Sequence, residues 1–181
     1  QPSDPFFLLS QGEIDLGRGA LLIGQQANPI LDVECYLAHL DQLADGFRHP
    51  QSRDCAVTVS ALGAYLFDEL GFRGNNEHYD ELANSYLNEV LDRRLGIPIT
   101  LSLVYIEVGK RLGLPLAGVN FPYHFLVRCD AGSETIYIDP FARGQRVGLA
   151  QLAERLPTTD GVKLQRAAHH LSAASPRDIL A

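Results

Sequence analysis

Hydrophobic residues in the first part of the chain recur at intervals of three and four, which is the spacing of one face of an α-helix. This pattern predicts three helices, over residues 13–25, 31–47 and 57–70. Gly71 follows the third helix and suits the left-handed backbone that commonly ends a helix. Together the three segments predict an N-terminal helical subdomain over residues 1–74.

The middle of the chain predicts a polar loop and then a buried helix. Residues 72–80 are rich in polar and turn-forming types, so we expect a surface loop that leads into a new helix near Asn84, ending at Gly96. Residues 99–112 are apolar on most faces, and Pro98 stands at the first turn, where proline is best tolerated. A helix that is apolar nearly all round is buried, so we expect this one to be central.

Three runs rich in Val, Ile, Phe and Tyr follow the buried helix and predict strands over residues 116–121, 123–129 and 134–138. A last short helix is expected over residues 149–155. Helices first and an antiparallel meander after them indicate an α+β fold rather than a Rossmann-type alternation. The core is therefore expected to cover residues 75–156, and residues 157–181 form a polar tail.

The composition is that of a folded globular protein, with 46% hydrophobic and 20% charged residues in a chain of 181. A formal net charge of -7, with no run of Lys or Arg, works against attraction to phosphate backbones, so we expect no nucleic-acid partner. The longest apolar stretch, residues 97–108, contains Thr100, Ser102 and Glu107. It is shorter than the roughly 18 apolar residues that a membrane span needs, so we expect no membrane partner.

The three cysteines, Cys35, Cys55 and Cys129, are widely spaced and form no Cys-x-x-Cys or Cys/His cluster. The sequence therefore predicts no metal site, no disulfide framework and no cofactor. Scattered cysteines in odd number are typical of a reducing compartment, which predicts a cytoplasmic protein. Cys35 and Cys55 fall within the N-terminal helical region, and we expect both to be buried as small hydrophobic residues.

His124 and Asp139 are the candidate reactive pair. The second and third predicted strands are separated by residues 130–133, which suits a tight hairpin with Ala131 and Gly132 at its tip. With that tip, His124 and Asp139 are cross-strand neighbours with Cβ atoms about 5 Å apart. The carboxylate could then accept a hydrogen bond from the imidazole Nδ1, as in the base-and-orienter half of a Cys-His-Asp site. The alternative is a structural histidine in a strand and a turn-forming aspartate before a proline.

The segment from Asn84 to Phe141 carries the most specific pattern in the chain. It contains the run NSYLNEVLDRRLGIPITLSLVYIEVGKRLGLPLAGVNFPYHFLVR, followed by YIDPF. In these motifs the chain resembles the SirB-type (UPF0162-like) proteins of bacteria, a branch of the transglutaminase-like superfamily that is also present in some eukaryotic F-box proteins. The helices over residues 15–74 resemble the family more loosely, in LDVECYLAHLDQLA and LFDELGFRGN. The resemblance implies a papain-like cysteine proteinase core, with a buried central helix packed on a small antiparallel sheet.

The resemblance also implies where a nucleophile would stand. Active members of the superfamily place a cysteine at the N-terminus of the buried helix, where the helix dipole helps to lower the thiol pKa. This sequence has no thiol there, and the residues are Gly96-Ile97-Pro98-Ile99-Thr100. Cys129 alternates with His124 along its strand and is expected to face away from it. Thr100 and Ser102 are candidate hydroxyl nucleophiles, although mid-helix hydroxyls usually bond to a backbone carbonyl one turn back.

The same region offers a candidate binding cleft, because the helix before the missing nucleophile is unusually polar. The residues expected to line the cleft, with His124 and Asp139 as a residual triad, are Asn84, Asn88, Arg94, Pro98, Tyr105 and Arg128. The alternative is a solvated helix face held by pairs four residues apart, such as Glu89 with Arg93.

Three functional hypotheses are open at this point. The leading one is a non-catalytic transglutaminase-like module, a pseudoenzyme, that binds a peptide or protein in the His124/Asp139 cleft. The second is a hydrolase or acyltransferase that uses Thr100 or Ser102 with His124 and Asp139. The third is a scaffold whose function lies on another surface. The sequence sets neither the identity of a partner nor the oligomeric state.

The ends of the chain predict a longer natural protein. The chain begins with Gln1 and shows no basic-then-apolar leader, so we expect a trimmed start and no signal peptide. Ser175-Pro176 suits a helix start, with Ser as N-cap and Pro at the first position, and Ile179 and Leu180 begin an apolar face. In the family this domain is typically followed by tetratricopeptide-like helices. We therefore expect the natural protein to continue beyond Ala181 into such a region.

Overall fold

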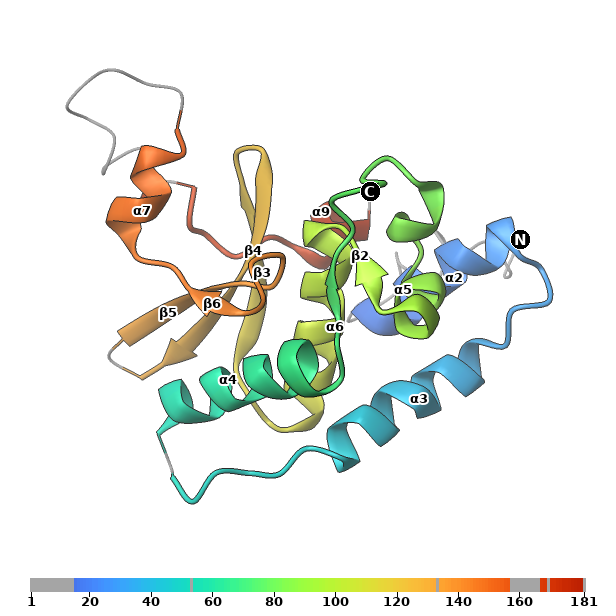
Figure 1. The fold of residues 1–181 in the computed structure, drawn as a ribbon, viewed down its shortest axis with the longest axis horizontal. Helices are drawn as coiled ribbons and strands as arrows, with labels where there is room; N and C mark the ends of the chain where they lie inside the picture. The colour runs from blue at the N-terminus through green and yellow to red at the C-terminus, as the bar shows by residue number, and fades with distance from the viewer. Residues whose placement is uncertain (1–14, 53, 133, 157–166, 169, 181) are drawn as a thin grey trace.

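The computed structural model describes residues 15–52, 54–132, 134–156, 167–168 and 170–180. Figure 1 shows a mixed arrangement in which a four-stranded sheet lies on one side and helices α2 (Leu16–Ala27), α3 (Val33–Asp45) and α5 (Leu87–Arg93) on the other, with helix α6 (Pro98–Arg111) between them. The α+β class predicted from the sequence is confirmed. Within the described ranges, no helix has both the length and the apolar character needed to cross a membrane.

The three N-terminal helices lie where the hydrophobic spacing predicts them: α2 (Leu16–Ala27), α3 (Val33–Asp45) and α4 (Cys55–Gly63). Each begins after an aspartate whose side chain accepts a backbone N–H of the first turn, namely Asp15, Asp32 and Asp54. Such N-caps satisfy amides that have no partner inside the helix. After α4 the chain continues through a π-helical turn, η1 (Ala64–Glu69), to Gly71, whose φ of 79° ends the segment as predicted.

The segment before the central helix differs from the prediction. A 3₁₀ turn, η2 (Leu82–Ser85), precedes α5 (Leu87–Arg93), and the helix ends at Arg94 rather than at Gly96. Arg94 has a left-handed backbone, with φ of 58°, which breaks the helical hydrogen bonds two residues early. Strand β2 (Leu95–Gly96) follows and runs parallel to β1 (Arg73–Gly74). This short ladder holds the polar loop after β1 beside the entrance to the central helix.

Helix α6 (Pro98–Arg111) is the central helix, as predicted. Nearly all of its residues are buried apart from the last turn, because its sides contact α3, α4 and α5 as well as strands β3 and β4. The chain then turns through Gly113, whose φ is 76°. A helix with only one apolar face could not fill this position.

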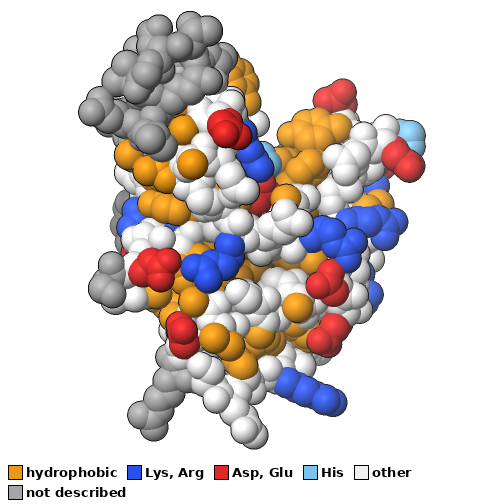
Figure 2. All heavy atoms as spheres, turned by 60° about the vertical axis from the view of Figure 1, so that its left-hand side comes forward, with side chains coloured by type: hydrophobic (Ala, Val, Ile, Leu, Met, Phe, Trp, Pro, Cys, Tyr) orange, Lys and Arg blue, Asp and Glu red, His pale blue; other side chains and the backbone are white. Residues whose placement is uncertain are grey.

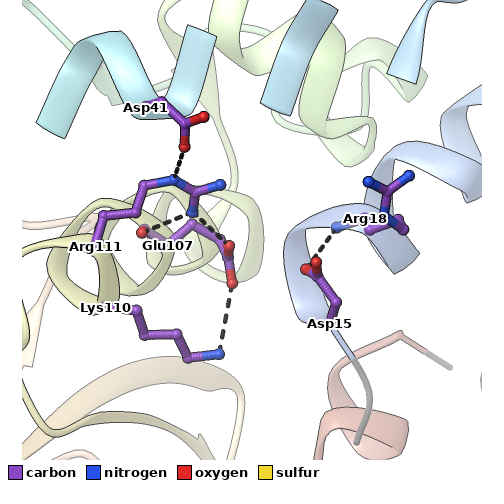
Figure 3. Close-up of polar contacts among 6 residues, drawn as sticks. All are labelled: Asp15, Arg18, Asp41, Glu107, Lys110 and Arg111. Carbon is purple, nitrogen blue, oxygen red and sulfur yellow. Dashed lines mark hydrogen bonds and ion pairs between the residues drawn. The ribbon is translucent and has the colours of Figure 1, made fainter. Parts of the chain in front are cut away.

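A buried carboxylate ties α6 to two N-terminal helices. Glu107 lies between Lys110, whose Nζ is 3.5 Å from Oε1, and Arg111, whose Nη1 is 2.9 Å from Oε2. The Nε of Arg111 also lies 2.6 Å from Oδ1 of Asp41 in α3, as Figure 3 shows. On the α2 side, a Cβ added at Gly17 would come within 2.6 Å of Oε2, so this close approach requires a glycine. Burial lowers the pKa of Arg111, but the hydrogen bonds to Asp41 and Glu107 outweigh it and the net shift is upward.

The sheet has four antiparallel strands in the order β3 (Leu116–Phe121), β4 (His124–Ala131), β5 (Glu134–Asp139) and β6 (Gln145–Arg146). The first three were predicted. Strand β6 was not, because its two exposed polar residues carry no apolar pattern. Phe125, Val127 and Cys129 of β4 belong to the core cluster that includes α6. Leu126 belongs to a second cluster with α7 (Leu149–Glu154) on the other face.

The register between β4 and β5 is shifted by two residues from the prediction. Ala131 pairs with Glu134 and Val127 pairs with Ile138, so Ala131 is part of the ladder and not of the hairpin tip. A shift of one residue would turn a side chain to the opposite face of the sheet, whereas a shift of two does not. Asp139 therefore stays on the same face as His124, but as its diagonal neighbour rather than directly opposite.

The described part of the predicted polar tail packs onto the sheet. Ala167 and Leu171 are buried in the α7-side cluster, and the amide of Ala174 donates to the carbonyl of Gly118 in β3. Helix α9 (Pro176–Leu180) follows, and Ile179 and Leu180 are buried in the main cluster. The predicted polar tail thus contains buried apolar residues besides the expected apolar face of Ile179 and Leu180, while residues 157–166 lie outside the described ranges. The proposed boundaries at 74/75 and 156/157 stay predictions.

Candidate functional site

The structure brings His124 and Asp139 together at the start of β4 and the end of β5. Nε2 of His124 lies 2.8 Å from Oδ2 of Asp139, and the two side chains are 16% and 2% exposed. In the described part of the chain Nε2 has no hydrogen bond of good geometry, so this short distance is a close approach rather than a well-aligned hydrogen bond. The contact is thus a close pair through Nε2, and not through Nδ1 as the sequence led us to expect.

Asp139 is held by two further donors. Nη1 of Arg155 lies 3.0 Å from Oδ2, and the backbone amide of Ala142 donates to Oδ1 at 3.1 Å. Burial raises the pKa of the Asp139 carboxyl, but His124, Arg155 and Ala142 together outweigh burial and leave the pKa below its ordinary value. The carboxylate is therefore charged at neutral pH and fixed in orientation.

The turn before His124 presents an aromatic side chain to solvent. Phe121 pairs with His124, which places Pro122 and Tyr123 at the tip of the β3–β4 hairpin. Tyr123 has a left-handed backbone, with φ of 59°, and is 93% exposed. A non-glycine residue with positive φ is uncommon, and such residues gather at ligand-binding and other functional positions.

One aromatic ring adjoins His124, and a second ring adjoins the first. The ring of Phe141 lies edge-on to that of His124, with centroids 6.3 Å apart, and Tyr79 lies edge-on to Phe141 at 6.0 Å. A Cβ added at Gly74 would come within 2.5 Å of Cε2 of Phe141, so Phe141 packs directly on strand β1. Gly74 pairs with Gly96 just before α6, so Phe141 contacts both His124 and the short ladder at the entrance to that helix.

This region is open to solvent. Figure 2 shows a notch between two lobes of the surface, with histidine, basic and acidic side chains meeting in it. A shallow hollow of about 540 Å³, formed by residues 77–81, adjoins the aromatic rings through Tyr79. A second hollow, of about 510 Å³, has Asp41, His49 and Arg111 in its wall, and none of the residues predicted for the site lines it.

The hydroxyls of the two candidate nucleophiles are both bonded to backbone groups. Oγ1 of Thr100 donates to the carbonyl of Asn84 at 2.7 Å and accepts from the amide of Ile97 at 3.1 Å. Oγ of Ser102 donates to the carbonyl of Pro98 one turn back, at 2.8 Å. Both side chains are buried, at 2% and 0% exposure. These hydroxyls hold the first turns of α6 together.

Asn84 and Asn88, predicted to line the cleft, are buried instead. Asn84 donates through Nδ2 to the carbonyls of His78 and Tyr79 and accepts from Asn75, so it shapes the polar loop. Asn88 lies against α2, because a Cβ added at Gly24 would come within 2.5 Å of its Oδ1. The polarity of Asn84 thus serves contacts inside the fold, whereas Oδ1 of Asn88 is buried without a hydrogen-bond partner among the described residues.

The other four predicted cleft residues are spread over the molecule. The side chain of Arg94 donates to the carbonyl of Leu70, and Pro98 is buried at the start of α6. Tyr105 is fully buried, with its hydroxyl donating to the carbonyl of Val59. Arg128 pairs with Asp130 and donates to the carbonyl of Leu171. Each of these residues is engaged by its own neighbourhood, and a shared cleft with His124 and Asp139 stays a prediction.

The cysteines lie away from His124. Cys35 is exposed, so the expectation that it is a core residue is wrong: it follows Asp32 in the first turn of α3, where only one face of the helix is covered. Cys55 is half-buried, and Cys129 is fully buried on the α6 side of the sheet, facing away from His124 as its alternation predicts. In the described ranges, no group of three or more His, Cys, Asp and Glu side chains could hold a metal ion.

Sequence reasoning missed three residues of this site: Arg155, Phe141 and Tyr79. Phe141 stands two positions after Asp139 in the YIDPF motif, and that nearness was the one available signal. Arg155 and Tyr79 lie 16 and 60 residues away along the chain from Asp139 and reach the site only through the tertiary fold.

The comparisons with known proteins agree with this architecture. The family model described as the transglutaminase-like superfamily matches residues 34–181. The chain belongs to that superfamily. A UPF0162 protein of Xylella fastidiosa is 40% identical over 139 residues, covering 76% of this chain and 50% of the relative. These matches identify the chain as a UPF0162, or SirB-type, member of the transglutaminase-like superfamily.

Further relatives extend across bacteria and animals. A UPF0162 protein of Pseudomonas aeruginosa is 32% identical over 173 residues, covering 95% of this chain and 63% of the relative. F-box only protein 21 of Homo sapiens is 34% identical over 161 residues, covering 71% of this chain and 26% of that protein. No solved structure matches. The chain spans about half the length of the Xylella relative.

Proposed function

We propose that this transglutaminase-like domain is a non-catalytic module that binds a peptide or protein at the site formed by His124, Asp139, Arg155 and the neighbouring aromatic rings. The observation that carries the proposal is the state of the two candidate nucleophiles. The hydroxyl of Thr100 donates a hydrogen bond to the backbone carbonyl of Asn84, and that of Ser102 donates to the backbone carbonyl of Pro98. A hydroxyl becomes a nucleophile only when a base within hydrogen-bond reach takes its proton.

Phe141 supports the same conclusion. Its ring lies against His124 on one side and against Gly74 on the other, beside the segment that enters α6. The superfamily resemblance implies a nucleophile at that end of α6. The ring of Phe141 occupies one side of the imidazole, which supports a role for the pair in contacting a ligand rather than in activating a neighbour.

The exposed groups around the pair are those of a recognition surface. Arg155 keeps 43% of its side chain exposed while it holds Asp139, and Tyr79 and Tyr123 are 48% and 93% exposed. Tyrosine and arginine are enriched at protein contacts because each combines apolar area with hydrogen-bond donors. A cytoplasmic location and a following tetratricopeptide-like region both stay predictions alongside this proposal.

A photo-crosslinking experiment tests the binding function. A photoreactive phenylalanine analogue placed at Tyr123 of the full-length protein is expected to capture a protein in the producing cells. The matched control places the analogue at Ile30, which is 91% exposed in the α2–α3 loop. Capture at Tyr123 alone, weakened by His124→Ala, supports the proposal. Equal capture at both positions, or none at Tyr123, contradicts it and favours a function on another surface.

A second experiment addresses catalysis. The purified protein is expected to show neither incorporation of a dansylated amine into casein nor cleavage of chromogenic peptide amides above the blank. A turnover that disappears in His124→Ala and in Thr100→Val or Ser102→Ala would contradict the non-catalytic assignment and establish the hydroxyl-dependent enzyme.

A further inference from the structure

We propose that Cys55 and Cys129 form a reversible intramolecular disulfide, so that the pair is an oxidation site that fastens helix α4 to the central strand β4. The inference is independent of the binding function proposed above. It starts from a contact between two residues that are 74 positions apart in the sequence.

The two sulfur atoms are already close to bonding distance. Sγ of Cys55 lies 2.9 Å from Sγ of Cys129, whereas a disulfide bond is about 2 Å long. The thiols come from different elements, the first turn of α4 and the middle of β4. A movement of about 1 Å between them is small enough for side-chain rotation and a slight shift of α4 to supply it.

The pair has one accessible and one enclosed member. Cys55 is half-buried and Cys129 is fully buried, so a soluble oxidant reaches Cys55 first. Burial, together with the neighbouring Cys55, raises the pKa of the Cys129 thiol to about 12. Cys129 therefore stays protonated until Cys55 has reacted with the oxidant. Cys129 then attacks the sulfur of the modified Cys55.

The surroundings favour a disulfide over other uses of two thiols. No third His, Cys, Asp or Glu joins them in a metal-binding group within the described ranges. Val59 of α4 also accepts from the hydroxyl of the buried Tyr105 in α6, so α4 is already held near this position. A covalent bond would lock an existing contact rather than impose a new one.

The proposed reaction uses a small-molecule disulfide as the oxidant. The thiolate of Cys55 attacks one sulfur of oxidised glutathione, a glutathione thiolate leaves, and a mixed disulfide forms. Cys129 then loses its proton to solvent and attacks the Cys55 sulfur, expelling a second glutathione thiolate. The two cysteines lose two electrons and two protons, and one oxidised glutathione becomes two molecules of reduced glutathione.

The test is to equilibrate the reduced protein in glutathione buffers of increasing oxidation and to quench with acid. Intact mass is expected to fall by two hydrogens, and a non-reducing peptide map is expected to join the peptides that contain Cys55 and Cys129. Thermal unfolding of the oxidised protein is expected to shift upward by roughly 5 to 10 °C, because the bond closes a long loop. Reduction should reverse both changes.

Three variants make the outcome decisive. Cys55→Ala and Cys129→Ala should each abolish the loss of two hydrogens, whereas Cys35→Ser, which removes the exposed cysteine, should leave it intact. Cys55→Ala alters a half-buried position, so it serves if the buried Cys129→Ala fails to fold. A product carrying glutathione at Cys55 without the internal bond, or a disulfide that involves Cys35, would overturn the proposal. So would a protein that stays reduced at every buffer ratio.

Discussion

Phe141 presents the edge of its ring to His124, with the ring centroids 6.3 Å apart and the ring planes at 79°. The same ring packs on Gly74 in the ladder that leads to α6, so it links the imidazole to the segment that enters the helix. In the described part of the chain, the imidazole of His124 contacts the Asp139 carboxylate and the ring of Phe141.

If the hydroxyls of Thr100 and Ser102 serve only the structure of α6, replacing them should change the free energy of unfolding and leave partner binding unchanged. Thr100→Val removes a buried hydroxyl that serves both the carbonyl of Asn84 and the amide of Ile97, and should cost about 1 to 3 kcal/mol in the free energy of unfolding. Ser102→Ala should stay within about 1 kcal/mol of wild type, because alanine favours the helix and the lost bond is an extra one to Pro98. Urea unfolding measures both. Capture at Tyr123 should survive in each variant, and its loss in Ser102→Ala would contradict the structural assignment.

Most helices and strands of this fold could be predicted because the apolar spacing records which face each element buries. The β4–β5 register could not be fixed in the same way. Alternation along β4 tells which residues share a face, but not whether Ala131 belongs to the ladder or to the turn. Two registers that differ by two residues bury the same side chains, so the correct face for Asp139 was obtained from an incorrect pairing.

Alkylation should reveal the absence of an activated thiol at the site. In the reduced protein, iodoacetamide is expected to label exposed Cys35 first and buried Cys129 last, in order of exposure. His124→Ala should leave all three rates unchanged, because no cysteine lies beside the imidazole in the described structure. Mass spectrometry of timed, quenched samples measures each site. A cysteine that reacts fastest in wild type and slows in His124→Ala would show that the imidazole does activate a thiol.

The Asp139 carboxylate should make stability depend on acid pH. Its pKa is lower in the folded protein than the ordinary value of 3.8. A lowered folded-state pKa contributes stability that is fully present above the unfolded value and is lost as pH falls through the folded one. Between neutral pH and pH 3.8 this contribution should therefore hold, and below 3.8 it should decline. Asp139→Asn should be less stable at pH 7 and lose less on acidification.

Asp68→Asn is the matched control for that measurement. It removes an exposed carboxylate that pairs with Arg143 at the surface, so the acid-dependent loss should match wild type. Urea unfolding at a series of pH values between neutral and strongly acidic supplies the comparison. An unchanged acid response in Asp139→Asn would show that the contacts to His124, Arg155 and Ala142 do not stabilise the charged form.

Glu107 should matter for stability although it lies far from the site. Glu107→Gln keeps the shape but removes the charge that Arg111 and Lys110 contact, and should cost about 2 kcal/mol, since a buried pair loses one member. Glu34→Gln breaks an exposed pair with Arg18 and should cause no measurable change. Chemical unfolding of both variants decides the point. Equal stabilities would mean that the Glu107 contacts in Figure 3 contribute nothing net.

The candidate site was less predictable than the fold for a physical reason. The sequence shows polarity, and polarity alone does not distinguish a side chain that faces a ligand from one that satisfies buried backbone groups. Asn84 and Thr100 belong to the second kind, since their partners are carbonyls and amides of the entrance to α6. Arg155 is partly exposed beside Asp139, and its connection to Asp139 exists only after α7 has packed on the sheet.

Gly74→Ala should disturb the site through Phe141 alone. A Cβ at this position would come within 2.5 Å of Cε2 of Phe141, so the ring has to move and the overpacking should cost about 1 to 3 kcal/mol. The matched control is Gly148→Ala, where the nearest atom to the new Cβ would be 3.8 Å away and the backbone is extended.

Movement of the Phe141 ring changes the ring-current shift that it imposes on the protons of His124, and NMR measures this chemical shift directly. The Cε1–H resonance of His124 is expected to shift in Gly74→Ala and in Phe141→Leu and to stay in place in Gly148→Ala. Crosslinking at Tyr123 should weaken in the first two variants, because the aromatic wall of the binding surface has changed. A shifted resonance with full crosslinking would show that the partner contacts Tyr123 without using the wall formed by Phe141.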